Sequence, residues 1–201
     1  LPEGITPEMV TLNDEVLDRA VARTLTEMFR LGMFENTYRD PKKAAQTVSG
    51  SPYWDSAELA HRQSVVLLKN DGILPLRSGE NIAVFGRCQL DWFYVGYGSG
   101  GDVHPPYRVN LMEGLYNAGV AVDQELADIY GNWCFSEDNK ADHGWWGHWP
   151  MSHPEMPLDP AMVSAAAQRC ETAVVVIGRA AGEDRENTLT KGSYYLTDEE
   201  T

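Results

Sequence analysis

The architecture of this 201-residue chain is best predicted from one stretch, Ala173-Val-Val-Val-Ile-Gly-Arg-Ala-Ala-Gly-Glu-Asp-Arg-Glu-Asn187. Its apolar run, Val174 to Ile177, is typical of a strand buried on both faces, as in a parallel sheet covered by helices. The loop after this strand is opened by Gly178 and Gly182 and then gathers charges from Glu183 to Glu186. Ligands of open α/β sheets bind at the carboxyl ends of the strands, so the loop is either a solvated turn or an acid placed beside a substrate.

Helices and strands alternate upstream of this stretch. A helix is predicted from Asp159 to Cys170, because an aspartate cap is followed by proline at the first helical position. The preceding elements are a strand over 81–86, a helix over 110–118, a short strand over 120–122 and a helix over 123–133. Downstream, Thr197-Asp-Glu-Glu200 has the spacing of a capping box. The alternation predicts an α/β fold, as part of a three-layer α/β/α sandwich with a mostly parallel sheet.

The amino-terminal third is predicted to contain helices and a polar stretch instead of alternating helices and strands. Residues 12–31 carry Leu17, Val21 and Leu25 at helical spacing, which predicts an amphipathic helix. The stretch 34–52 is polar and interrupted by proline and glycine, as in a linker. A further helix is predicted from Asp55 to Lys69.

Composition and charge exclude several kinds of partner. The formal net charge of −14 argues against nucleic acids and anionic membranes, which are held by clusters of Lys and Arg. No apolar run approaches the roughly 20 residues of a membrane span. The three cysteines, Cys88, Cys134 and Cys170, form no Cys-x-x-Cys pair and are interpreted as reduced thiols. We expect a cytoplasmic protein, and secretion stays open because the chain begins at Leu1.

The glycine-rich run Gly96-Tyr-Gly-Ser-Gly-Gly101 fits the dinucleotide pattern G-x-G-x-x-G in letters only. In a nucleotide fold these glycines leave a strand directly and open a helix, whereas here Asp102-Val-His-Pro-Pro106 follows them. No cofactor is therefore expected. The run is either a plain tight turn or a loop in which Ser99 and bare backbone amides approach a polar ligand.

An aromatic segment lies between residues 134 and 157. His143, His148 and His153 are five residues apart in an irregular loop, which does not match helical metal-ligand spacing, so no metal site is predicted. The tryptophans, among them Trp146, are suited to stacking on sugar rings. A structural aromatic cluster that holds a long insertion is an equal alternative.

Several of these stretches together resemble the family 3 glycoside hydrolases, the retaining β-glucosidase and β-xylosidase group. The most specific is Ala60-His-Arg-Gln-Ser-Val-Val-Leu-Leu-Lys-Asn-Asp-Gly-Ile-Leu-Pro-Leu76, which is similar to the entry into the second domain of that family. Gly32-Met-Phe-Glu-Asn36 resembles the end of the preceding barrel domain. The runs 96–101 and 178–187 complete a likeness that covers nearly the whole chain.

The resemblance implies a (β/α)8-type barrel with an aspartate nucleophile, followed by an α/β sandwich domain whose loops close over the active site. The nucleophile's usual Ser-Asp-Trp run is absent from this sequence. We therefore interpret residues 1–35 as the helical end of a barrel, 36–54 as a linker and 55–201 as the first part of the sandwich. The implied partners are a β-glucoside or oligosaccharide, the barrel and the remainder of the sandwich; a homodimer is compatible with the exposed apolar helix.

By the same resemblance Glu183 is the general acid/base, and Ser99 lies in the loop that reaches toward the sugar. Arg185 and Trp146 are further substrate-binding candidates, Trp146 by stacking on a sugar ring, while Arg185 has the alternative role of holding the loop in place. A shifted alignment moves the acid to Glu186. A general acid must be protonated before it acts, so we expect burial by a closing barrel and the charges of Asp184 and Glu186 to raise the pKa of Glu183, with Arg185 opposing them. The implied activity is hydrolysis of terminal β-D-glucosyl residues by a chain that is inactive alone; the alternative is a carbohydrate-binding or regulatory module without catalysis.

Overall fold

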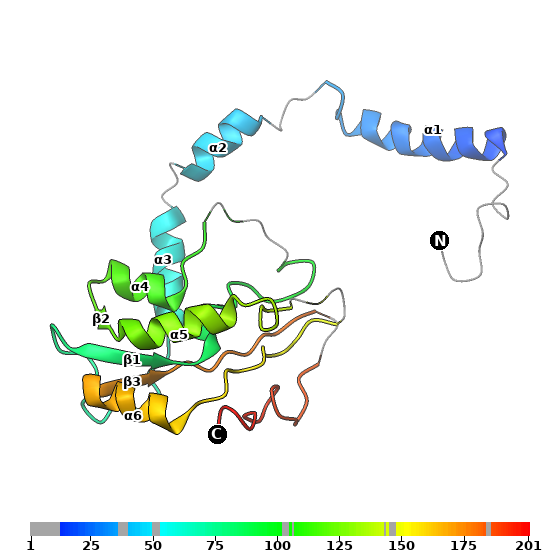
Figure 1. Cartoon of the computed structure of the whole chain (residues 1–201). Coiled ribbons are helices and arrows are strands. Elements are labelled where there is room, and N and C mark those ends of the chain that lie inside the picture. Colours follow the sequence, from blue (N-terminus) through cyan, green and yellow to red (C-terminus); the bar gives the residue numbers. More distant parts are fainter. Residues whose placement is uncertain are drawn as a thin grey trace. The chain divides into compact units, whose positions relative to one another are not determined.

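The structure is a computed structural model that describes residues 13–35, 40–49, 53–101, 105, 107–142, 144, 148–183 and 186–201. The chain divides into two compact units, residues 1–69 and 70–201 (Figure 1). The predicted domain boundaries at residues 35 and 54 stay predictions.

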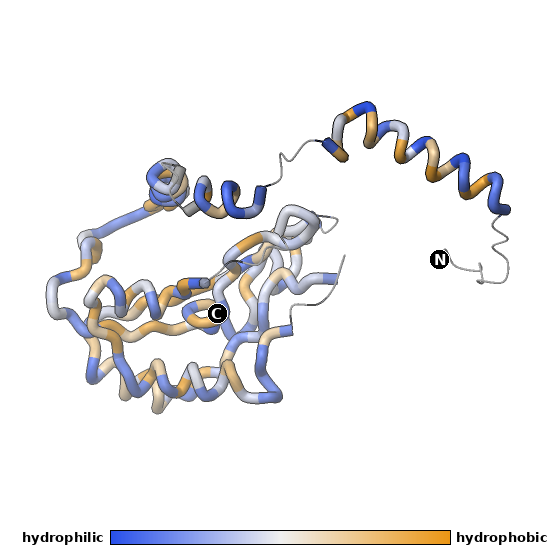
Figure 2. The backbone as a smooth tube through the Cα atoms, turned by 90° about the horizontal axis from the view of Figure 1, so that it is seen from above, coloured by the Kyte–Doolittle hydropathy of each residue, from blue (hydrophilic) through white to orange (hydrophobic). Residues whose placement is uncertain are grey.

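Where the structure describes the first unit, it contains three helices, α1 (Asp14–Arg30), α2 (Pro41–Ser49) and α3 (Tyr53–Ser64). The predicted amphipathic helix is confirmed as α1. Its start is capped by Asn13, whose side chain accepts a hydrogen bond of 2.8 Å from the backbone N–H of Glu15. Hydrophobic and hydrophilic residues alternate along α1 in Figure 2, yet none of its 17 residues, all of which the structure describes, is buried.

The first unit adds one helix to the predictions and shortens another. The stretch predicted as a linker contains α2, because Asp40 caps it through the backbone N–H groups of Lys42 and Lys43 and Pro41 occupies its first position. The helix predicted to reach Lys69 ends at Ser64 as α3. The β-branched pair that follows Ser64 has low helix propensity, which is consistent with this earlier end.

The second unit is built on a parallel sheet in the order β2–β1–β3 (Figure 1). Strand β1 (Asn81–Phe85) lies between β2 (Ala121–Val122) and β3 (Thr172–Val175). Among its described residues this unit has the helices α4 (Leu111–Asn117), α5 (Gln124–Cys134) and α6 (Pro160–Arg169), with a 3₁₀ turn, η2 (Arg87–Gln89), directly after β1. The predicted parallel α/β fold is confirmed.

Strand β1 forms the centre of the core because its side chains are buried on both sides. Ile82 and Val84 pack against Met112 of α4. Ala83 and Phe85 lie in a second cluster with Leu126 and Tyr130 of α5 and Ala166 of α6. Helices therefore cover both faces of the sheet, as expected for a three-layer arrangement.

Strand β3 corrects the prediction made from Val174 to Ile177. It has the predicted length of four residues but starts and ends two residues earlier, and the predicted run is not buried on both faces: Val175 is 65% exposed and Ile177 45%. Within the described part of the chain β3 pairs with β1 alone, so it is an edge strand. A run of apolar residues predicts that a strand is buried. Whether the strand lies at the centre or at the edge of the sheet depends on which other strands pair with it.

Two further features complete the second unit. The predicted capping box at 197–200 is confirmed, because the backbone N–H of Thr197 donates to Glu200 Oε2 at 2.8 Å and the N–H of Glu200 donates to Thr197 Oγ1 at 3.3 Å. None of the helices in the described residues has the length and apolar character needed to cross a membrane.

Candidate active site

The candidate site is formed where β1 and β3 end. The two strands run side by side in the same direction, with Ile82 opposite Thr172 and Phe85 opposite Val175, so the loops that follow them leave at the same edge of the sheet. These loops then meet again at an isolated parallel bridge between Tyr97 and Gly182. The N–H of Tyr97 donates to the carbonyl of Ala181 at 2.8 Å, and the N–H of Glu183 donates to the carbonyl of Tyr97 at 3.2 Å.

This bridge brings together two of the residues singled out from the sequence, Ser99 and Glu183, which are 84 positions apart. Glu183 Oε2 accepts two hydrogen bonds from Ser99, one from the backbone N–H at 2.9 Å and one from the hydroxyl at 2.6 Å. The glycine-rich run is thus not a plain tight turn. Its backbone and the hydroxyl of Ser99 contact the predicted acid.

Gly98 makes the contact sterically possible. Its φ is +106°, a conformation that side-chain-bearing residues rarely adopt. A Cβ at this position would lie 2.4 Å from Cβ of Glu183. The absence of a side chain at Gly98 therefore lets the two loops approach closely enough for Ser99 to reach the carboxylate.

The charge state of Glu183 in this chain is set by Ser99. The hydroxyl of Ser99, and then its backbone N–H, hold the pKa of Glu183 below the ordinary glutamate value, while partial desolvation opposes them. The side chain is exposed here and both bonds favour its charged form, so the expected rise of this pKa on burial by a barrel stays a prediction. Glu183 is a carboxylate in this structure at neutral pH.

Stacked aromatic rings support the loop after β1. The Tyr97 ring stacks on Trp149 with centroids 5.4 Å apart and planes 5° apart. Phe93 stacks on His153 at 4.7 Å and meets the edge of Tyr97 at 6.4 Å. Trp149 and His153 come from the predicted aromatic segment, so the reading of that segment as a structural cluster is confirmed for these two residues.

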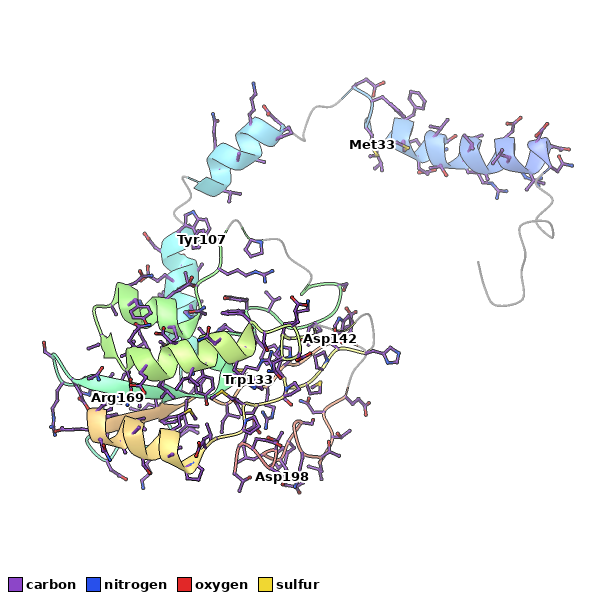
Figure 3. All side chains as sticks on the ribbon, viewed as in Figure 1. Met33, Tyr107, Trp133, Asp142, Arg169 and Asp198 are labelled. Atoms are coloured by element: carbon purple, nitrogen blue, oxygen red, sulfur yellow. The ribbon has the colours of Figure 1, made fainter. Side chains whose placement is uncertain are left out.

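The aromatic segment is also anchored by Arg87, a residue that sequence reasoning missed. Arg87 is 1% exposed. Its guanidinium donates to Asp91 Oδ2 at 2.6 Å, to the carbonyl of Pro154 at 2.9 Å and to the carbonyl of Asn139, and its backbone N–H donates to Glu155 Oε2 at 2.7 Å. It also lies over the ring of Trp133, a residue labelled in Figure 3. Arg87 thereby fixes both ends of the segment to the end of β1.

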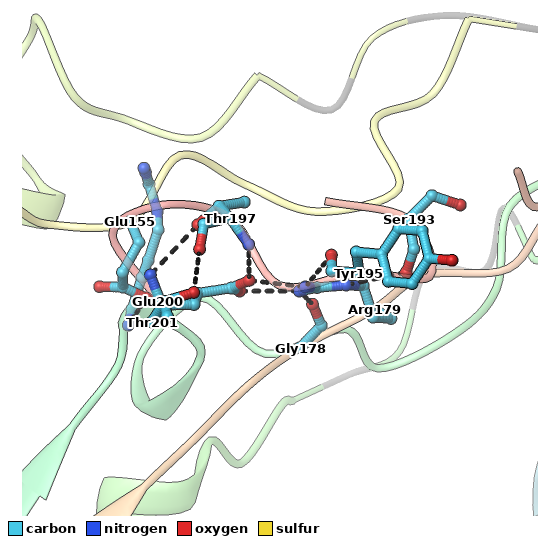
Figure 4. Close-up of polar contacts among 9 residues, drawn as sticks. Glu155, Gly178, Arg179, Ser193, Tyr195, Thr197, Glu200 and Thr201 are labelled. Atoms are coloured by element: carbon cyan, nitrogen blue, oxygen red, sulfur yellow. Dashed lines mark hydrogen bonds and ion pairs between the residues drawn. The ribbon is translucent and has the colours of Figure 1, made fainter. Parts of the chain in front are cut away.

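A second arginine missed from the sequence, Arg179, secures the chain after the Glu183 loop (Figure 4). It pairs with both oxygens of Glu200, at 2.7 and 2.6 Å, and donates to the carbonyls of Gly178, Ser193 and Tyr195. Arg87 and Arg179 both follow a glycine shortly after a strand ends. That shared Gly-Arg pattern is the sequence signal by which they could have been found.

The other predicted site residues are only partly placed. Arg185 and Trp146 lie outside the described residues, so their predicted roles remain predictions. Glu186 is described and exposed. No group of three or more His, Cys, Asp and Glu side chains with metal-binding geometry occurs among the residues that the structure describes. A pocket of about 280 Å³ lies beside the aromatic segment, lined in part by Lys140, Asp142 and His148.

Fold and site together define an α/β domain that presents a hydrogen-bonded carboxylate at the carboxyl edge of a parallel sheet. Sequence comparison then gives the family: the profile of the glycosyl hydrolase family 3 C-terminal domain matches residues 65–199. The chain belongs to glycosyl hydrolase family 3.

Individual relatives agree with this assignment. The chain is 38% identical over 148 residues to a beta-glucosidase of Ruminococcus albus, a match that covers 74% of this chain and 16% of the relative. A crystal structure of a beta-glucosidase from Paenibacillus barengoltzii is similar with a TM-score of 0.69 and 41% identity, over 75% of this chain and 16% of that one. The structure of beta-glucosidase 3B from Thermotoga neapolitana in complex with glucose has a TM-score of 0.62 and 30% identity, over 94% of this chain and 26% of that one. The chain therefore spans about a sixth to a quarter of the length of these relatives.

Proposed function

We propose that this chain supplies the general acid/base, Glu183, of a retaining exo-β-glycosidase of the β-glucosidase type. The observation that carries the proposal is the position of Glu183, on a loop at the carboxyl edge of the sheet and held there by Ser99. That edge is where open α/β sheets bind ligands. The names of the relatives support a β-glucoside as substrate.

The chemistry requires a second carboxyl group that this chain does not provide. A retaining glycosidase places two carboxyl groups about 5–5.5 Å apart, one to attack the anomeric carbon and one to protonate the leaving oxygen and later deprotonate water. We infer that the nucleophile belongs to a barrel domain of a larger protein, and that the chain alone does not hydrolyse glycosides. The match covers only 16% of the length of the beta-glucosidases from Ruminococcus albus and Paenibacillus barengoltzii, which supports this inference.

The two steps of the proposed reaction require Glu183 in opposite protonation states. The charged form that the two bonds from Ser99 favour is the form that serves as a base in the second step. The first step needs the protonated form, and a sugar and a barrel covering the exposed side chain would supply the desolvation that raises its pKa. The low pKa of the uncovered chain is therefore compatible with the proposed role.

The test compares the full-length protein that carries this chain with its Glu183→Ala variant on two aryl β-glucosides, one with a good leaving group and one with a poor one. A poor leaving group depends on protonation, whereas a good one leaves unaided. We expect kcat/KM for the poor substrate to fall by roughly 10²–10⁴-fold, the usual contribution of general acid catalysis, with a much smaller loss for the good substrate.

Glu186→Ala is the matched control, since it removes an exposed carboxylate three residues away. It should leave the ratio between the two substrates unchanged. Equal losses on both substrates for Glu183→Ala, or a selective loss for Glu186→Ala, would exclude Glu183 as the proton donor. If the chain alone binds cello-oligosaccharides, as followed by tryptophan fluorescence, while Glu183→Ala has no effect on hydrolysis, the chain is a carbohydrate-binding module instead.

A further inference from the structure

We infer that Ser99 is a positioning residue for the acid/base: by donating twice to Glu183 Oε2, it leaves Oε1 as the oxygen that gives and takes the proton. The inference rests on the proposed function of Glu183 and goes beyond it, because it assigns the two carboxyl oxygens different tasks. It also differs from a role for Ser99 in sugar binding.

The first step of the argument is that the two donors on Ser99 form a rigid pair. Both hydrogen bonds, at 2.9 and 2.6 Å, come from one residue and end on one oxygen. The loop that carries Ser99 is held to the loop of Glu183 by the Tyr97–Gly182 bridge. The carboxyl group is thus fixed in position and in rotation about its last bond, as proton transfer along a defined direction requires.

The second step concerns where a proton can reside. A backbone N–H is a donor only, so a proton on Oε2 would face the N–H of Ser99 and lose that bond. A proton on Oε1 leaves both bonds to Oε2 intact. Protonated Glu183 therefore carries its proton on Oε1, and the same oxygen accepts the proton from water in the second step.

The third step concerns the other groups around Glu183. Its pKa is governed by Ser99 and by desolvation, and no charged side chain of the described residues contributes to it. Glu186 is exposed nearby in sequence, and Asp184 and Arg185 lie outside the described residues. Among the described residues, the hydroxyl of Ser99 therefore has the largest effect on the pKa of Glu183.

The direct test is a ¹³C NMR titration of the Glu183 side-chain carboxyl in the 201-residue chain, with no substrate involved. In Ser99→Ala we expect the pKa of Glu183 to rise toward the ordinary glutamate value, because the hydroxyl bond that favours the charged form is lost. Ser99→Thr keeps a hydroxyl and should retain the low pKa. Ser164→Ala, which removes an exposed hydroxyl from α6, is the matched control and should leave the Glu183 titration unchanged.

The second readout is the pH profile of kcat/KM in the full-length protein. Activity on a substrate with a poor leaving group requires protonated Glu183 and is lost as pH rises through the pKa of Glu183. Because Ser99→Ala raises this pKa, the fall of kcat/KM on the alkaline side of the profile should shift to higher pH. Loss of orientation should lower kcat by up to about 100-fold with little change in KM, and Ser99→Thr should restore most of it. A rise in KM alone, with an unchanged pH profile, would mean that Ser99 contacts the sugar and overturns the inference.

The two proposals fail in different ways. An unchanged titration in Ser99→Ala, together with a selective loss of the poor substrate in Glu183→Ala, removes the role of Ser99 and leaves that of Glu183. Equal losses on both substrates in Glu183→Ala remove both roles, whatever the titration shows. If Ser99→Ala does not fold, Ser99→Cys, whose thiol is a weak donor of similar size, should give the same upward shift.

Discussion

At the scale of single residues, Glu200 has the clearest link between a contact and stability. Its carboxylate is 7% exposed and forms a two-point pair with Arg179. Arg179 first, helped by the backbone N–H of Thr197 and opposed by desolvation, holds the pKa of Glu200 below the ordinary value of 4.5. A carboxyl group whose pKa is lower in the folded state binds fewer protons there than in the unfolded chain. Its stabilising effect is complete above the ordinary pKa and is lost as pH falls through the lowered one.

We therefore predict that Glu200→Gln lowers the free energy of unfolding at neutral pH by about 1–3 kcal/mol, the usual effect of hydrogen bonds to charged groups. The difference from wild type should shrink as pH falls below about 4.5, because wild-type Glu200 then becomes protonated as well. Urea unfolding at a series of pH values measures this. Glu199→Gln, at an exposed neighbour, is the control; a constant difference across the pH series would contradict the assignment.

Gly98 allows a second prediction at this scale. Gly98→Ala should displace the Glu183 loop, because the new methyl group meets Glu183 Cβ and the backbone conformation is unfavourable for alanine by about 1–3 kcal/mol. We expect kcat of the full-length protein to fall by up to about 100-fold. Gly100→Ala changes the same loop where a Cβ meets nothing within 4 Å and should be tolerated. Similar activities for the two variants would show that the close approach is not needed.

At the scale of elements, the aromatic segment depends on one buried side chain. Arg87→Lys keeps the charge but loses the planar fork that joins Asp91 to the carbonyls of Asn139 and Pro154. We predict a loss of about 2–4 kcal/mol in unfolding free energy and faster amide hydrogen exchange over residues 138–156. Arg77→Lys, at an exposed arginine, should change neither. Unchanged exchange over the segment would refute the anchoring role.

The elements also show what sequence can and cannot predict. Helices α1, α4 and α6 were predicted close to their bounds because their signals are local: Asn110 and Glu113 form a capping box, and Asp159 caps α6 ahead of a proline. The edge position of β3 was missed because it depends on which strands pair. The Ser99–Glu183 contact was not predicted: the resemblance placed each residue near substrate, but the Tyr97–Gly182 bridge that joins their loops leaves no periodic pattern in the sequence.

At the scale of the whole molecule, the first unit presents exposed apolar side chains on α1 and after α3. In α1 the stripe of Leu17, Val21 and Leu25 is exposed, and Val65 to Leu68 are 62–92% exposed. A helix without packing partners is only marginally stable, because tertiary contacts supply most of its free energy. These surfaces are suited to another domain or to a second copy of the chain.

We predict that the 201-residue chain self-associates through the α1 stripe when no other domain covers it. Val21→Glu places a charge in the centre of the stripe and should weaken association by roughly tenfold or more, since a buried carboxylate would lack a partner. Thr26→Glu adds the same charge on the polar face of α1 and is the matched control. Sedimentation equilibrium across a concentration series measures both. A chain that stays monomeric throughout, or equal weakening by the two variants, would place the contact elsewhere and remove the case for a homodimer built on α1.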